Sequence, residues 1–135
     1  MVHVLVITHG SLSEGLRDTS EMIIGSSSNL YTISLKPGMG HEDLTELIGE
    51  VRSKISPQDE LLILLDLLGG SPAIACARAL QDDVSIGVIT GVNLPMFLEV
   101  MMNREKLTLR ELVDLAMMSG KEGILNLRET LKDQL

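Results

Sequence analysis

The sequence predicts a doubly wound α/β domain whose mainly parallel sheet has strand order 2-1-3-4 and helices on both faces. Short apolar runs alternate with helical segments of roughly 10 to 15 residues, the pattern of parallel strands joined by right-handed crossovers. The run from Leu61 to Leu65 has no polar alternation, as expected for a strand covered on both faces. This strand order places the topological switch point between the first and third strands.

The first strand is predicted at Val2 to Ile7, an apolar run followed by Thr8-His9-Gly10-Ser11. Ser11 and Glu14 have the S-x-x-E spacing of a capping box, which predicts that a helix begins at Ser11. Gly25 and the serines after it end that helix.

The third strand leads into a glycine turn and another helix. Gly69 and Gly70 permit a tight turn, and Ser71-Pro72 is typical of an N-cap and a first helical position. Thr108 and Glu111 repeat the capping-box spacing. The remaining strands are predicted at Leu30 to Leu35 and Val84 to Ile89, and the remaining helices at Glu42 to Lys54, Ser71 to Leu80, Leu94 to Met102 and Thr108 to Met118.

After these elements, Ile124 to Leu127 is predicted as a short strand, and the charged tail from Arg128 to Leu135 as helical or frayed.

Length and composition restrict the class of protein. Residues 1–135 suit one domain, and no apolar run approaches the ~20 residues that cross a bilayer. The run from Val2 to Ile7 is too short for a signal peptide, so a cytoplasmic location is expected. Cys76 is the only cysteine, so no internal disulfide forms, which suits a reducing compartment. A net charge of −8 and 1% aromatic residues argue against nucleic-acid binding and favour a basic protein partner.

Two chemically useful residues follow the first and third strands. His9 and Asp66 are 57 residues apart in the chain (66 minus 9), but the predicted topology brings them together across the switch-point crevice. If Asp66 accepts a hydrogen bond from Nδ1 of His9, the Nε2 lone pair faces outward as a nucleophile.

Backbone donors for an anion are predicted beside this pair. Free N–H groups at helix N-termini and glycine turns bind phosphate and stabilise its charge. The predicted site is therefore a phosphohistidine site, with His9 as the nucleophile and Asp66 as its orienting acid. The predicted phosphate-binding residues are Gly10, Ser11, Gly69, Gly70 and Ser71.

Other chemistries have weaker support. A hydrolase with Ser11, Ser13 or Ser71 as nucleophile lacks the G-x-S-x-G elbow, and a serine at a helix start already has a capping role. No G-x-G-x-x-G follows the first strand, and no cofactor is expected. No metal is expected either, because the three histidines and Cys76 lack metal-ligand spacing.

The loop from Lys36 to Gly40 is flexible enough to flank the site, with an ordinary loop as the default interpretation. Four further candidates are interpreted as structural: His41 (a surface residue), Asn93 to Pro95 (a helix start), His3 (on the far side from His9) and Cys76 (a buried small apolar residue).

Three motifs carry a family resemblance: Val6 to Gly10, Leu65 to Pro72, and Ile89 to Met96. In order and spacing they resemble the IIA component of the mannose family of the bacterial sugar phosphotransferase system, and the likeness spans nearly the whole chain. The resemblance implies a phosphotransferase in which His9 accepts a phosphoryl group from the carrier protein HPr and passes it to a IIB component. It also implies that Asp66 orients His9 and that Ser71 helps to hold the phosphate.

The resemblance further implies a homodimer in which one antiparallel strand, here Ile124 to Leu127, is exchanged between subunits. Leu68 stands where relatives often have an aromatic residue. The IIB domain that follows in some relatives is missing from this sequence, so a separate IIB protein is expected, and association with a membrane transporter only through it.

Two alternatives remain open. One is a regulatory module that presents phosphorylated or bare His9 to a regulator of sugar metabolism. The other is the related phosphotransferase subunit of a dihydroxyacetone kinase, which usually lacks the GGSP form, so Gly69 to Pro72 argue against it. The transported sugar is not encoded in these motifs.

Overall fold

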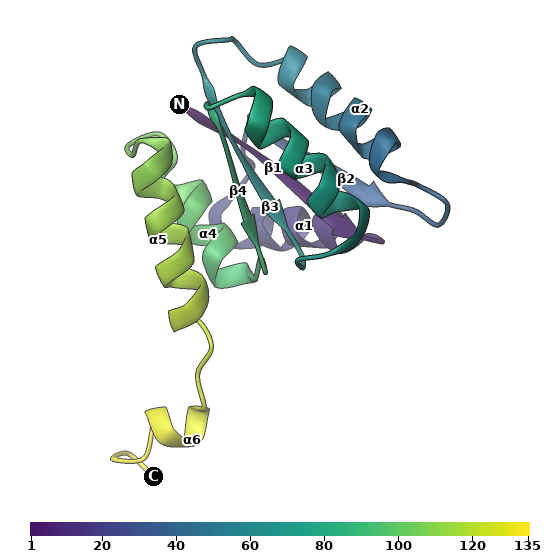
Figure 1. The fold of residues 1–135 in the computed structure, drawn as a ribbon. Helices are drawn as coiled ribbons and strands as arrows, with labels where there is room; N and C mark the ends of the chain where they lie inside the picture. The colour runs from purple at the N-terminus through teal and green to yellow at the C-terminus, as the bar shows by residue number, and fades with distance from the viewer.

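Four parallel strands form one sheet in the order β2-β1-β3-β4 in the computed structural model, which describes all residues 1–135 (Figure 1). Val4 of β1 lies opposite Leu30 of β2 on one side and Leu62 of β3 on the other, and Leu62 lies opposite Gly87 of β4. The predicted strand order is confirmed. The strands are β1 (Val2–His9), β2 (Leu30–Leu35), β3 (Glu60–Leu65) and β4 (Ile86–Thr90).

Helices cover both faces of the sheet, with α2 and α3 on one face and α1, α4 and α5 on the other (Figure 1). The α-helices are α1 (Leu12–Ile24), α2 (His41–Ser53), α3 (Gly70–Asp82), α4 (Leu94–Asn103), α5 (Leu109–Glu122) and α6 (Leu127–Thr130). None of them combines the length and hydrophobicity that crossing a bilayer requires.

The core consists of two apolar layers separated by the sheet. Successive side chains of a strand point to opposite faces. Val4 and Val6 therefore pack against α1, α4 and α5, whereas Leu5 and Ile7 pack against α2 and α3. Both layers are apolar, which explains the unbroken apolar runs Val4 to Ile7 of β1 and Leu61 to Leu65 of β3.

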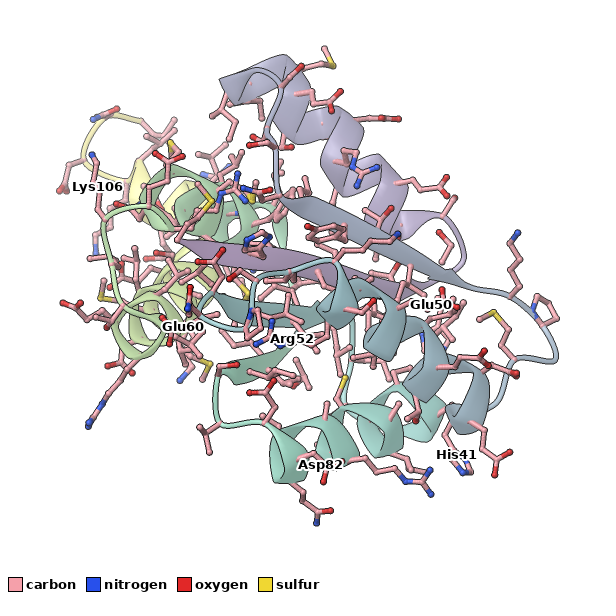
Figure 2. All side chains as sticks on the ribbon, turned by 90° about the horizontal axis from the view of Figure 1, so that it is seen from above. His41, Glu50, Arg52, Glu60, Asp82 and Lys106 are labelled. Atoms are coloured by element: carbon pink, nitrogen blue, oxygen red, sulfur yellow. The ribbon has the colours of Figure 1, made fainter.

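The fourth strand begins two residues later than predicted. Asp83 accepts hydrogen bonds from the Ser85 N–H and hydroxyl through Oδ1, and its carbonyl accepts from the Ile86 N–H. This turn holds Val84 out of the sheet, where it is 98% exposed. Asp83 also pairs with Arg52 of α2 at 2.9 Å; Figure 2 labels Arg52 and Asp82, the residue before Asp83. The side-chain bonds from Ser85 and Arg52 lower the Asp83 pKa to about 2.

The predicted capping box at Ser11 is wrong. Helix α1 does follow Ser11, but the Ser13 N–H donates to Thr8 Oγ1 at 2.7 Å, and the Glu14 carboxylate accepts from the Ser34 hydroxyl at 3.2 Å. The Thr8 hydroxyl, held in place by β1, accepts the capping bond, and the Ser11 side chain accepts none. The box at Thr108 and Glu111 is confirmed, with bonds of 3.2 and 3.1 Å.

The predicted strand at Ile124 to Leu127 is not formed in the single chain. Residues 124–126 have no regular structure, and Leu127 begins α6, which lies away from the sheet (Figure 1). Ile124, Leu125 and Leu127 are exposed although all three are apolar. Exchange of this segment between subunits stays a prediction.

Candidate active site

The site lies at the carboxyl end of the two central strands. His9 is the last residue of β1, and Asp66 directly follows β3. The register pairs Ile7 with Leu65, the last residue of β3, so β1 continues two residues further, to His9, at the same end of the sheet. The predicted encounter of His9 and Asp66 is confirmed, because parallel neighbours end at one edge.

Asp66 holds His9 at two points. Its Oδ2 accepts a hydrogen bond from the His9 backbone N–H at 2.8 Å and lies 2.8 Å from Nδ1 of the ring. Its Oδ1 accepts from the Leu67 N–H at 2.8 Å. The Asp66 side chain is only 11% exposed, whereas that of His9 is 57% exposed. The carboxylate is thus fixed by the fold, and the imidazole is fixed by the carboxylate.

These contacts determine the proton positions. Burial favours a raised pKa for Asp66, but the hydrogen bonds from His9 and Leu67 outweigh it and hold the pKa of this carboxyl below its usual value. Asp66 is therefore ionised at neutral pH and acts only as an acceptor. Its short contact with Nδ1 requires a proton on Nδ1, so in the neutral imidazole the lone pair lies on Nε2.

His9 opens into a cleft of about 500 Å³. Its walls come from three places: the end of β1, the loop after β2, and the first turn of α3. The lining residues are His9, Gly10, Leu35, Lys36, Pro37, Gly38, Met39, Ser71 and Pro72.

The loop after β2 flanks the cleft, as its flexible sequence allowed. Lys36 to Met39 form one wall of the cleft. The signal for this was the strand order itself. Because β2 lies beside β1 and parallel to it, the loop after β2 leaves the sheet at the edge that carries His9.

The predicted phosphate-binding residues lie around this edge, but only two line the cleft, Gly10 and Ser71. Ser11, Gly69 and Gly70 are outside the lining. Helix α3 begins at Gly70 with Gly69 as its N-cap, so Ser71 lies in the first turn and the predicted Ser71 cap is wrong. No side chain caps this N-terminus, which leaves its first N–H groups available to an anion.

The turn into α3 depends on its two glycines. Gly69 and Gly70 have φ values of 137° and 65°, which L side chains rarely adopt. Any other residue at either position would be strained, so the path of the chain from Asp66 to Ser71 depends on both glycines.

The other candidate residues have structural roles. Both ring nitrogens of His3 are bonded, Nδ1 to the Tyr31 hydroxyl and Nε2 to Asp59 Oδ2, each at 3.2 Å. His41 lies at the start of α2, at the periphery of the molecule (Figure 2). Asn93 caps α4 by accepting from the Met96 N–H at 3.0 Å.

Comparison with known proteins agrees with this fold. The family model EIIA-man, described as PTS system fructose IIA component, matches residues 3–117. The chain is 36% identical over 124 residues to the PTS system mannose-specific EIIAB component of Escherichia coli strain K12, covering 91% of this chain and 38% of that protein. This chain thus spans less than half of the length of that relative.

Two further relatives match most of their own length. The PTS system fructose-specific EIIA component of Bacillus subtilis strain 168 is 34% identical over 114 residues, which cover 84% of this chain and 78% of that protein. The crystal structure of the phosphotransferase system component EIIA from Streptococcus agalactiae superposes with a TM-score of 0.87 and 26% identity, covering 96% of this chain and 99% of that one.

The fold, the histidine–aspartate pair and these matches define the class as a component of the sugar phosphotransferase system (PTS). Within that class, the chain belongs to the EIIA-man family of sugar-specific IIA components, whose relatives include mannose, fructose and sorbose proteins.

Proposed function

We propose that this chain is a cytoplasmic phosphocarrier: His9 accepts a phosphoryl group from phospho-HPr and passes it to a IIB component for coupled sugar uptake and phosphorylation. The observation that carries the proposal is the 2.8 Å contact between His9 Nδ1 and Asp66 Oδ2. It leaves Nε2 as the reactive nitrogen of an exposed ring in a cleft wide enough for a phosphoryl group.

The transfer is a displacement at phosphorus. The Nε2 lone pair of His9 forms the new N–P bond while the bond between phosphorus and the donor atom breaks, and the bonding electron pair leaves with the donor. The Nδ1 proton stays between His9 and Asp66 throughout. The ring gains positive character as the N–P bond forms, and the ionised carboxylate stabilises it. Transfer to IIB repeats the step with His9 as the leaving group.

The phosphoryl oxygens need donors in the cleft. The free N–H groups at the start of α3, the Ser71 hydroxyl and the backbone at Gly10 lie around the space into which His9 opens. We assign phosphate binding to these groups. Ser11, Gly69 and Gly70 form the turns next to the cleft and are proposed as further phosphate-binding residues. Donors fixed before the phosphate arrives cost no reorganisation during transfer.

A carrier must also dock two protein partners at the same histidine. Leu12, Leu67 and Leu68 are apolar and exposed on the segments that follow His9 and Asp66. Exposed apolar residues beside a reactive group favour contact with a partner surface. Leu68, in place of an aromatic residue, still supplies apolar area there.

Phosphotransfer assays test the proposal. Incubation with the general PTS proteins and labelled phosphoenolpyruvate is expected to label the wild-type chain with acid-labile, alkali-stable phosphate. His9→Ala abolishes the label, whereas the matched His41→Ala variant is labelled like the wild type. Equal labelling of His9→Ala refutes the assignment of the nucleophile.

A further inference from the structure

One wall of the His9 cleft carries an unpaired positive charge. Lys36 is the only lysine or arginine among the nine lining residues, and no aspartate or glutamate lines the cleft. The Lys36 side chain takes part in none of the four ion pairs of the chain.

The sheet fixes the position of Lys36 relative to His9. The β1–β2 register pairs His9 with Leu35, and the Gly10 N–H donates to the Leu35 carbonyl at 3.0 Å. Lys36 is the next residue, so its backbone lies beside Gly10. This placement does not depend on the side-chain conformation of Lys36.

A tight turn of residues 36–39, which follows β2, also fixes the backbone of Lys36. The Met39 N–H donates to the Lys36 carbonyl at 3.1 Å, and the Lys36 N–H points to Met39 Sδ at 3.3 Å. Gly38 within this turn has a φ of 89°, which favours glycine. The lysine thus leaves a defined turn at the cleft wall.

We infer that Lys36 is a phosphate-contacting residue, whose ammonium pairs with the phosphoryl oxygens on Nε2 of His9 during transfer. The inference rests on the proposed function. The other groups around His9 offer only dipoles: backbone N–H groups, the Ser71 hydroxyl and the α3 N-terminus. A phosphoryl group brings a negative charge close to ionised Asp66, and Lys36 is the one lysine or arginine in the cleft wall that can offset it.

The chemistry of lysine suits a group that moves between partners. Its ammonium is a compact charge on a flexible stem, so it can follow the phosphoryl group without a fixed bidentate geometry. Lys36 forms no covalent bond, so the bonds formed and broken at phosphorus are the same with or without this contact.

The test compares three variants with the wild type. Lys36→Met removes the charge, and Lys36→Arg keeps it. Lys106→Met makes the same change in net charge in the turn after α4. That turn lies at the opposite end of the strands from His9, because the Arg104 carbonyl accepts from the N–H of Val2, the first residue of β1. Figure 2 shows Lys106 and the start of α2 at His41 on opposite sides of the molecule.

The first readout is the rate of His9 phosphorylation by phospho-HPr. Lys36→Met is expected to lower the rate about 10-fold or more, Lys36→Arg to recover most of it, and Lys106→Met to match the wild type. The second readout is the ³¹P titration of the phosphorylated chain without a partner. Loss of a neighbouring cation shifts the phosphate titration to higher pH in Lys36→Met only.

The outcomes separate the inference from the proposed function. A slow Lys36→Met with an unchanged ³¹P titration assigns the lysine to partner docking and overturns the phosphate contact. Equal rates and titrations in Lys36→Met and Lys106→Met also overturn it, while the wild type still becomes phosphorylated. Failure of the folded wild type to accept phosphate at all refutes the proposed function itself.

Discussion

At the level of single residues, the proposed mechanism gives Asp66 the task of selecting which nitrogen of His9 reacts. It binds the backbone and the ring of the same residue through one oxygen atom, and its other oxygen is held by Leu67. The ring therefore has its orientation and its tautomer before any partner arrives, which is the preorganisation that group transfer needs.

Replacement of Asp66 by Asn tests this role. The amide keeps the size of the side chain but loses the charge that stabilises the Nδ1 proton as the N–P bond forms. We expect Asp66→Asn to slow His9 phosphorylation by about 10²-fold or more, with unchanged circular dichroism. Rapid-quench assays with phospho-HPr measure the rate.

The second histidine–aspartate pair provides the control. Asp59→Asn removes the charge beside His3, whose other ring nitrogen bonds to Tyr31. This variant is expected to transfer phosphate at the wild-type rate. A similar loss in both variants contradicts a specific role for Asp66.

The site could be predicted in part from the sequence. His9 and Asp66 each follow an apolar run, and strand order alone brings such positions together. The sequence Lys-Pro-Gly is by itself typical of a surface turn, so nothing local to Lys36 indicates a role at the site. The predicted order 2-1-3-4 does place the loop after β2 at the end of the sheet that carries His9, and the structure shows both lining one cleft.

At the level of elements, the contact between α4 and α5 depends on small residues. A Cβ atom at Gly123 would lie 2.5 Å from the Pro95 ring, and one at Gly120 would lie 2.8 Å from the end of Met96. Asn93 ties the same ends together by donating to the Gly120 carbonyl at 2.9 Å. The end of α5 is therefore fixed against the start of α4.

Gly123→Ala is expected to destabilise the protein by about 1–3 kcal/mol, because the Pro95 ring is stiff and the helices must separate. Gly15→Ala is the matched change in α1, where an added Cβ meets nothing within 4 Å. There the substitution is expected to stabilise the protein by about 0.5–1 kcal/mol. Urea unfolding measures both, and a stabilising effect of Gly123→Ala would contradict the described packing.

The elements also show where local sequence signals fail. The central strands were predictable because both of their faces are buried, which demands apolar residues throughout. The start of β4 was not, because the β-branched Val84 favours a strand and Asp83 imposes a turn. The cap of α1 was misassigned because Thr8 reaches the helix from the preceding strand.

At the level of the whole molecule, residues 124–127 form an apolar segment that does not pack against the core. Ile124, Leu125 and Leu127 expose apolar side chains next to α5, and β4 forms one open edge of the sheet. An open edge is a template for pairing with another strand. We propose that this segment pairs with a second copy of the chain, as the family resemblance implies.

Sedimentation analysis tests the dimer. The wild type is expected to sediment with twice the mass of one chain, and Leu125→Asp to shift it towards the monomer, because a buried unpaired charge opposes assembly. Leu135→Asp is the matched change at an equally exposed leucine outside the segment and is expected to stay dimeric. A monomeric wild type contradicts the proposal.

Cys76 has a practical consequence for studying the partners. It is the only thiol, it is buried in the layer between the sheet and α3, and burial raises its pKa to about 11. Maleimide reagents attack thiolates on accessible surfaces, so they leave the native chain unmodified. A cysteine introduced on the rim of the His9 cleft becomes the single attachment point for a fluorophore, and docking of each partner can then be followed one molecule at a time.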